Sequence, residues 1–304
     1  MEYIMTTEGL TKTYGSKDAA KDINIHIREG EVYGLIGRNG AGKTTIMRML
    51  SGLSAPTSGT FTLFGDSGAK AKSHLNQVGV LIEHPGLYPK KSAYENLYIK
   101  CLGMGYKKKN YINELLEIVG LENVGKKPAG SFSLGMRQRL GIALALVGDP
   151  KMIILDEPIN GLDPQGIVEV RQMLAKLRDE RKITIMISSH ILEELSKLAD
   201  SYGIIHEGEL MDEFTSEELN RRCGQYISVK TTDNESAVRT LKNEGFNNVE
   251  IDNDDIIRVS ERIEESLQIN TLLMNAKIGV KEIFVNNISL EDYYLSVTGG
   301  KHNG

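Results

Sequence analysis

The sequence contains only two cysteines, Cys101 and Cys223, and no apolar segment long enough to cross a membrane. So few thiols, far apart, are typical of a reduced cytoplasmic protein, in which structural disulfides are rare. A membrane-spanning helix needs about 18 apolar residues in succession, whereas the longest apolar run, residues 140–147, is better interpreted as a buried helix. Because the N-terminus also lacks the basic and apolar regions of a signal peptide, we expect a cytoplasmic protein.

Positive charge is not in excess either, because the formal net charge is −5. Binding to nucleic acid depends on clustered basic residues, so we expect no nucleic-acid partner. The proportions of hydrophobic residues (40%) and charged residues (25%) are those of an ordinary soluble globular protein. A chain of 304 residues predicts about two domains, each large enough to bury its own core.

The N-terminal two-thirds of the chain alternates between strand-like and helix-like patterns. Short apolar segments at residues 32–36, 152–155 and 183–187 have the length and β-branching of buried strands. Helical patterns, such as residues 43–50 and 167–181, fall between them. This alternation predicts an α/β fold with a parallel sheet covered by helices. Ligands of such sheets bind at the carboxyl ends of the strands, where we expect every motif described below.

The segment GRNGAGKT, residues 37–44, follows one of these strands and precedes a helix. Its glycines let backbone N–H groups approach phosphate oxygens that side chains would block. Lys43 is expected to reach the β- and γ-phosphates of a nucleotide, and Thr44 to place its hydroxyl on Mg²⁺. A chance match in a glycine-rich turn is disfavoured by the flanking strand and helix. The predicted nucleotide-binding residues of this loop are Gly37, Arg38, Asn39, Gly40, Ala41, Gly42, Lys43, Thr44 and Thr45.

Two carboxylates, Asp156 and Glu157, follow the apolar segment at residues 152–155. Asp156 ends a buried strand and is expected to hold Mg²⁺ through water. Glu157 is expected to polarise the water that attacks the γ-phosphate. In phosphoryl transfer the protein mainly positions groups and stabilises charge, so a misplaced carboxylate is costly. Without the preceding phosphate loop, an ordinary exit from strand to turn would be the better interpretation.

A third motif, SLGMRQR at residues 133–139, stands between the phosphate loop and Asp156. This order of motifs resembles the ATP-binding cassette (ABC) family over about residues 4–211. The resemblance implies a P-loop NTPase domain at residues 1–211, with a helical subdomain at about residues 88–146. It also implies that two ATP-binding chains act together, as a homodimer or as paired ATPase subunits.

The resemblance also assigns a role to the SLGMRQR segment. Ser133 and the Gly135 backbone would contact the γ-phosphate of ATP bound to the other subunit. The family usually has glycine where this chain has Leu134, at which a positive φ would be strained. It has glutamine where this chain has Met136, so no side-chain role is expected there. Ser133 also suits the N-cap of a helix, which is compatible with phosphate binding.

Three further residues take their roles from the resemblance. His190 resembles the switch histidine that senses the γ-phosphate, although a lone histidine at a helix start is usually structural. Asp163, in the segment GLDP, would link the two ATP sites. Tyr14 resembles the aromatic residue that stacks on adenine, the alternative being an exposed turn tyrosine.

Glu83 departs from the family pattern, which usually has glutamine at this position. Glutamate keeps an oxygen ligand for Mg²⁺ but adds a negative charge near the triphosphate. This glutamate, the segment at residues 86–89 and the segment at residues 290–294 resemble the branch of ABC proteins that exports peptide antibiotics such as bacitracin and lantibiotics.

The resemblance therefore implies an ATPase subunit of a peptide-antibiotic exporter, bound to the inner face of the cell membrane through permease subunits encoded separately. Its cofactors would be ATP and Mg²⁺. The alternatives are a motor for another cargo, such as sodium, a lipid or a small drug, and a non-transport ABC ATPase that uses ATP closure as a clamp. A regulatory subunit without turnover is disfavoured by the presence of Glu157 and His190.

The C-terminal residues 212–304 have a different pattern and are predicted to form an accessory domain. Strands and helices are expected in the order βαββαβα, which suggests a small ferredoxin-like module. An acidic segment, residues 252–255, is interpreted as a hairpin turn because it lacks the spacing of an EF-hand calcium loop. The expected elements are strands at residues 226–229, 249–251, 256–259 and 280–285 and helices at residues 235–244, 263–276 and 290–297.

Overall fold

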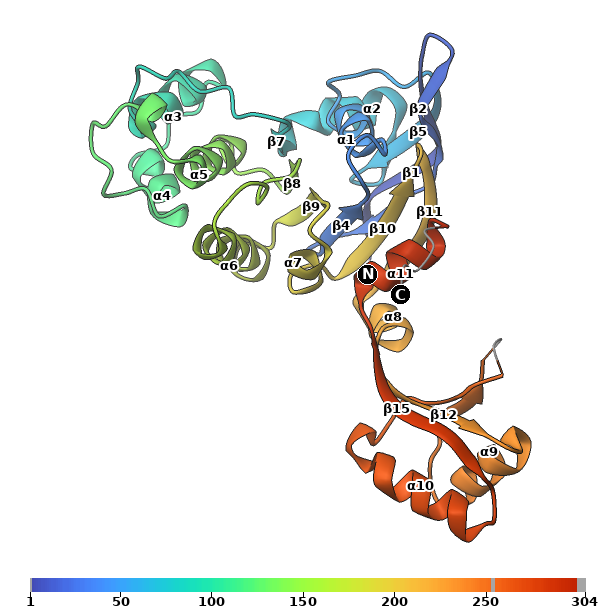
Figure 1. Ribbon diagram of the computed structural model, residues 1–304. Helices are drawn as coiled ribbons and strands as arrows, with labels where there is room; N and C mark the ends of the chain where they lie inside the picture. The colour runs from blue at the N-terminus through green and yellow to red at the C-terminus, as the bar shows by residue number, and fades with distance from the viewer. Residues whose placement is uncertain (1, 253–254, 300–304) are drawn as a thin grey trace. The chain divides into compact units, whose positions relative to one another are not determined.

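The computed structural model describes residues 2–252 and 255–299. The chain divides into two compact units, one ending at Ser216 and the other beginning at Glu217 (Figure 1). The boundary predicted at residue 211 falls inside strand β11 (Glu209–Thr215), five residues before this division. Among the described residues, no helix has both the length and the apolar character needed to span a membrane.

A six-stranded sheet forms the centre of the first unit, with the strand order β11-β10-β4-β9-β8-β7. Its neighbouring strands are parallel except for β11, which runs antiparallel to β10. Every residue of β4, β8 and β9 is buried, as expected for parallel strands covered on both faces. The predicted parallel sheet is therefore confirmed. Besides β11, the strands are β4 (Val32–Ile36), β7 (Val78–Leu81), β8 (Met152–Leu155), β9 (Thr184–Ser189) and β10 (Ser201–His206).

Helices cover both faces of the central sheet. Tyr33 and Leu35 of β4 belong to the same core cluster as Met47 of α1. Gly34, between them, points to the opposite face, where a Cβ would lie 2.7 Å from Leu195 Cδ2 of α7. The helices beside the central sheet include α1 (Lys43–Leu50), α6 (Pro164–Arg181) and α7 (Leu192–Ser196). The short helix α2 (Gly68–Ser73) packs against strands β5 (Ser58–Leu63) and β6 (Asp66–Ser67), and the 3₁₀ turn η1 (His74–Gln77) leads from it into β7.

A second, antiparallel sheet was not predicted from the sequence. Its strands are β1 (Tyr3–Tyr14), β2 (Lys17–Ile23), β3 (His26–Arg28), β5 (Ser58–Leu63) and β6 (Asp66–Ser67). Three register shifts interrupt the pairing of β1 with β2 and β3, and a fourth its pairing with β5. Such irregularities break the strict two-residue alternation by which a half-buried strand is recognised.

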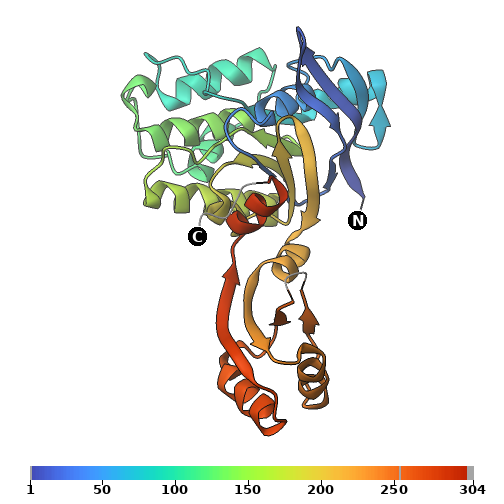
Figure 2. The same cartoon turned by 45° about the vertical axis from the view of Figure 1, so that its right-hand side comes forward.

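A helical group occupies the segment predicted as the helical subdomain. It consists of α3 (Ala93–Gly103), α4 (Tyr111–Ile118), η2 (Ala129–Ser131) and α5 (Leu134–Ala145). In Figures 1 and 2 this group, in green, and the antiparallel sheet, in blue, flank the central sheet on opposite sides. The helices approach the sheet closely, because a Cβ on Gly79 of β7 would lie 1.9 Å from the carbonyl oxygen of Ala145.

Local chemistry sets the start of α3. The Ser92 side chain accepts a hydrogen bond from the backbone N–H of Glu95, and the Glu95 carboxylate accepts one from the N–H of Ser92. This capping box satisfies two backbone donors that the first helical turn leaves unpaired. The bond from the Ser92 backbone, together with Lys91, lowers the pKa of Glu95 to about 2. Further along α3, burial raises the pKa of the Cys101 thiol.

The second unit contains a four-stranded antiparallel sheet in the order β13-β14-β12-β15. Together with the element order βαββαβα, this arrangement is that of the predicted ferredoxin-like module. Its core includes Ile227, Val229, Leu241 and Ile269. Asn253 and Asp254, within the predicted acidic turn, lie outside the described residues. The elements are α8 (Ser216–Arg222), β12 (Gly224–Thr231), α9 (Asn234–Asn243), β13 (Val249–Ile251), β14 (Ile257–Val259), η3 (Ile263–Glu265), α10 (Ser266–Asn275), β15 (Val280–Ile288) and α11 (Leu290–Val297).

Candidate active site

The phosphate loop opens into a cavity of about 840 Å³ in the first unit. Four parts of the chain that are distant in sequence meet there, namely the loop with the start of α1, the β1–β2 hairpin, the turn between β10 and β11, and Glu157 after β8. The lining residues are Lys17, Asp18, Ala19, Arg38, Asn39, Gly40, Ala41, Gly42, Lys43, Thr44, Thr45, Glu157, His206, Glu207 and Gly208. All residues predicted for the loop except Gly37 therefore line one cavity.

The backbone of the loop requires glycine at two positions. Gly40 and Gly42 have φ angles of 82° and 113°, which residues with side chains rarely adopt. A Cβ on Gly42 would also lie 2.5 Å from the carbonyl oxygen of Ala19 in the β1–β2 hairpin. Helix α1 begins at Lys43, so its N-terminal N–H groups and the positive end of its dipole face the cavity.

Lys43 is almost completely buried, with 5% of its side chain exposed. Its Nζ donates to the carbonyl oxygen of Gly37 at 2.6 Å and forms an ion pair with Glu157 Oε1 at 3.1 Å. A lysine is buried in this way only when its charge is paired. Glu157 and the loop carbonyls therefore hold the ammonium group that is predicted to bind phosphate.

The two predicted carboxylates lie beside this lysine. Asp156 is buried, and its Oδ2 accepts a hydrogen bond from Thr44 Oγ1 at 2.7 Å. Glu157 contacts His190 through Oε2 and Nδ1, which are 2.6 Å apart. The structure thus brings Lys43, Thr44, Asp156, Glu157 and His190 into one connected cluster.

Ser188 also belongs to this cluster, although the sequence did not single it out. Its Oγ donates to Asp156 Oδ1 at 2.6 Å and accepts from the Glu157 backbone N–H at 2.9 Å. In the sequence it is only a polar residue near the end of a buried strand. The pairing of Leu155 with Ile187 across β8 and β9 places it beside Asp156, and that pairing depends on the strand order.

Tyr14 does not line the cavity. It ends β1 and pairs with Lys17, which does line it. The ring is half exposed, and Lys12 Nζ lies 5.2 Å from its centre. The structure therefore places Tyr14 on the hairpin that borders the cavity, and adenine stacking stays a prediction.

Glu83 contacts neither Thr44 nor Asp156. Its Oε1 forms an ion pair with Arg48 at 2.6 Å, and both side chains are exposed. The backbone of Glu83 has a φ of 64°, just beyond the end of β7. Arg48, which lies on α1 one turn beyond the phosphate loop, was not recognised from the sequence. A role of Glu83 in holding Mg²⁺ stays a prediction, and Arg48 already offsets its charge.

We expect Glu83→Gln to leave nucleotide affinity without Mg²⁺ within about threefold of wild type, because Glu83 does not line the cavity and its exposed ion pair with Arg48 is a weak interaction. The Mg²⁺ concentration for half-maximal ATP turnover and the coupling to transport should change, since the charge beside α1 is lost. Both are measured by Mg²⁺ titration of turnover and by a transport assay. Unchanged Mg²⁺ dependence together with unchanged transport would refute a role for this charge.

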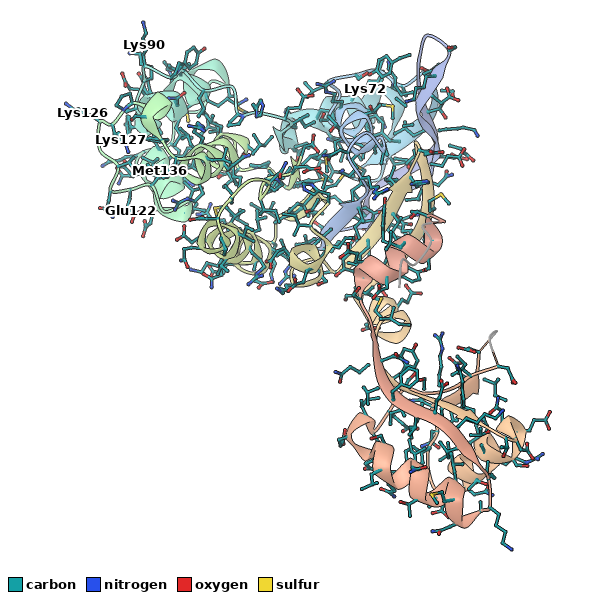
Figure 3. All side chains as sticks on the ribbon, viewed as in Figure 1. Lys72, Lys90, Glu122, Lys126, Lys127 and Met136 are labelled. Carbon is teal, nitrogen blue, oxygen red and sulfur yellow. The ribbon has the colours of Figure 1, made fainter. Side chains whose placement is uncertain are left out.

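The SLGMRQR segment lies outside the cavity of its own chain. Figure 3 shows Met136 in the helical group, away from α1. Ser133 caps α5 by accepting a hydrogen bond from the Met136 N–H at 3.2 Å, and it follows a 3₁₀ turn. The expectation that every motif lies at the carboxyl end of a strand is therefore wrong for Ser133. Leu134 begins α5 without a positive φ.

Gly135, in the SLGMRQR segment, lies close to the loop that ends at Asp163, since a Cβ on Gly135 would lie 3.7 Å from Leu162 Cδ2. Asp163 caps α6, accepting from the Gly166 N–H at 3.0 Å. The loop before it approaches the SLGMRQR segment, since a Cβ on Gly161 would lie 3.1 Å from Leu134 Cδ2. Gly135 and Asp163 thus belong to a second, exposed region of the first unit.

The chain is similar to known proteins over its whole length. A family model described as ABC transporter matches residues 20–160. The bacitracin transport ATP-binding protein BcrA of Bacillus licheniformis is 45% identical over 302 residues, which cover 99% of this chain and 99% of that protein. The chain is an ABC transporter ATP-binding protein. The lantibiotic transport ATP-binding protein SrtF of Streptococcus pyogenes is 45% identical to this ABC protein over 208 residues, covering 68% of the chain and 89% of SrtF.

A solved structure supports the same assignment. CbiO1 of Clostridium perfringens, part of the ABC transporter complex CbiONQ, superimposes with a TM-score of 0.65 at 30% identity. The match covers 72% of this chain and 91% of CbiO1. The predicted ABC nucleotide-binding fold is therefore confirmed, and the cavity at the phosphate loop stays the predicted ATP-binding site.

Proposed function

We propose that this ABC protein is the ATP-hydrolysing subunit of an exporter of peptide antibiotics of the bacitracin or lantibiotic type. The observation that carries the cargo class is the 45% identity to the bacitracin transport protein BcrA along nearly the full length of both chains. The identity to the lantibiotic transport protein SrtF supports the same class. The chain would act at the inner face of the cell membrane, with separately encoded permease subunits forming the pathway.

The cluster around Asp156 has the chemistry of a Mg²⁺ site. Asp156 and Thr44 present a buried carboxylate and a hydroxyl whose oxygens are 2.7 Å apart, and Mg²⁺ prefers oxygen ligands beside substrate phosphates. Thr44 would hold the ion directly and Asp156 through water. When bound, Mg²⁺ neutralises part of the charge on the β- and γ-phosphates.

ATP binding and hydrolysis follow from the contacts of Lys43 and Glu157. On binding, the β- and γ-phosphates take the place of Glu157 as partners of Lys43. The released Glu157 carboxylate then accepts a hydrogen bond from the attacking water and aligns it with the γ-phosphate. His190, which contacts Glu157 at 2.6 Å, lies where it can respond to that phosphate. Tyr14 would stack on the adenine from the hairpin bordering the cavity.

A second ATP-binding chain would complete the site. Ser133 and Gly135 lie outside the cavity of their own chain, which is the arrangement needed if they close over ATP held by a partner. Asp163, beside this segment, would connect the two sites. We propose a dimer of two identical or related ATPase subunits that closes on two ATP molecules and reopens after hydrolysis. The C-terminal residues 212–304 would act as an accessory domain.

Antibiotic susceptibility tests the cargo assignment directly. Cells expressing the chain with its neighbouring membrane-protein genes are exposed to bacitracin and a panel of lantibiotics, beside a matched Glu157→Gln strain. Tolerance that rises only with intact Glu157 is the expected result. If neither strain is protected while the purified chain hydrolyses ATP, the cargo assignment is wrong, and sodium, lipid or small-drug export becomes the next candidate. ATP binding without turnover would instead refute the ATPase proposal.

A further inference from the structure

Ser188 connects the two acidic residues of the site, Asp156 and Glu157, through its hydroxyl group. It is fully buried near the end of β9. Ile187 pairs with Leu155 in the parallel ladder of β8 and β9. The residues that follow them, Ser188 in β9 and Asp156 just beyond the end of β8, therefore lie side by side. The position makes the Ser188 hydroxyl a shared partner of Asp156 and Glu157.

The direction of both hydrogen bonds is determined by the groups involved. The backbone N–H of Glu157 can only donate, so Ser188 Oγ accepts from it at 2.9 Å. The single hydroxyl proton is then donated to Asp156 Oδ1 at 2.6 Å. Because Thr44 occupies the other oxygen, Oδ2, both carboxylate oxygens of Asp156 have a partner. Hydrogen bonds to an ionised acceptor are strong and directional, so they orient this carboxylate.

The second bond acts on the backbone of Glu157. Glu157 has a φ of 49°, in the left-handed region that residues with side chains rarely adopt. Such a conformation persists only where the surroundings hold it. The bond from the Glu157 N–H to Ser188 is one such restraint. In this conformation the carboxylate reaches both Lys43 and His190.

We propose that Ser188 is the positioning residue of the ATPase site. Its hydroxyl orients the Asp156 carboxylate toward Thr44 and the Mg²⁺ position, and it holds the backbone that directs Glu157 toward Lys43 and His190. The proposal rests on the proposed ATP hydrolysis, but it also predicts an effect on Mg²⁺-dependent nucleotide binding that requires no turnover.

The test compares the purified full-length chain with its Ser188→Ala variant. Affinity for a fluorescent ATP analogue is measured in Mg²⁺ and in EDTA, and ATP turnover is measured over a Mg²⁺ titration. Affinity in EDTA should stay within about twofold, because the phosphate loop and Lys43 are untouched. The gain in affinity from Mg²⁺ should fall about tenfold, and kcat should fall about 10- to 100-fold, as found when a partner of a metal-holding group is removed.

Thr184→Val is the matched structural control. Thr184 is also fully buried on β9, and its Oγ1 accepts from the Gly30 N–H at 2.9 Å, but it lies at the opposite end of the strand. This variant should lose thermal stability like Ser188→Ala while keeping the wild-type response to Mg²⁺. Ser188→Thr, which retains the hydroxyl, should restore both Mg²⁺-dependent affinity and turnover.

Two outcomes would overturn the positioning role. One is a wild-type Mg²⁺ response in Ser188→Ala, and the other is an equal loss of that response in Thr184→Val. Should Ser188→Ala fail to fold, Ser188→Cys preserves the volume with a weaker donor and is judged by the same criteria. If the wild-type chain binds ATP without turning it over, the hydrolysis proposal fails, and the comparison of Mg²⁺ with EDTA still decides on Ser188.

Discussion

Replacing Glu157 with glutamine should abolish most ATP turnover while ATP binds more tightly. Loss of a carboxylate that orients and polarises water lowers kcat by about 10²- to 10⁴-fold. The same change removes the ion pair at 3.1 Å by which Glu157 competes with phosphate for Lys43. We expect the ATP dissociation constant to fall by a factor of about five, corresponding to roughly 1 kcal/mol for a pair partly shielded from water. Phosphate release and equilibrium binding measure the two effects.

Glu180→Gln provides the control for this variant. Glu180 is exposed on α6, so the same loss of one negative charge there should leave turnover and affinity as in wild type. Turnover within tenfold of wild type in Glu157→Gln would show that another group orients the water. Weaker ATP binding in that variant would show that the Lys43–Glu157 pair does not compete with phosphate.

Replacing Lys43 with methionine should abolish ATP binding at ordinary concentrations. Methionine preserves much of the length of the buried side chain but removes the charge that pairs with Glu157 and is predicted to bind phosphate. A hydrogen bond to a charged group contributes about 1.5–3 kcal/mol, so losing the phosphate contacts should weaken ATP binding by about 100-fold. Equilibrium binding of a fluorescent ATP analogue measures this loss, and turnover should fall with it.

Lys176→Met is the matched control, because Lys176 is exposed on α6 and far along the chain from the phosphate loop. It should bind ATP as the wild type does. The thermal melting of Lys43→Met is measured in parallel, since the Glu157 carboxylate keeps its contact with His190 but loses the ammonium group and comes to lie beside a buried apolar side chain. A folded Lys43→Met variant that keeps wild-type affinity would contradict the assignment of Lys43 as the phosphate ligand.

The chemistry of the phosphate loop could be predicted because it is encoded locally. The φ angles of Gly40 and Gly42, the start of α1 at Lys43 and the strand that precedes them are properties of a few consecutive residues. The same holds for Asp156, which directly follows a buried strand. Identity of nearly half the residues with BcrA then extends the family assignment along the whole chain.

The antiparallel sheet could not be predicted in this way. Its longest strand, β1, pairs with β2, β3 and β5 in registers that shift along its length, so its buried residues do not alternate regularly. The boundary between the two units was also placed too early. Strand β11 continues to Thr215 because it pairs with β10 of the central sheet, a long-range contact that a change in local pattern does not reveal.

The sequence by itself determined the motifs, the parallel sheet, the order of elements in the C-terminal module and the family, because each is carried by short local patterns and by their order along the chain. Only the tertiary structure decided how the site is connected. The ladder of β8 and β9 brings Ser188 to Asp156, and the loop after β7 brings Glu83 to Arg48 rather than to Asp156. These partners are 32 and 35 residues apart. The strand order and the path of the loop after β7 bring these partners together. The residues around Ser188 and Glu83 show no hydrophobic periodicity from which these contacts could have been predicted.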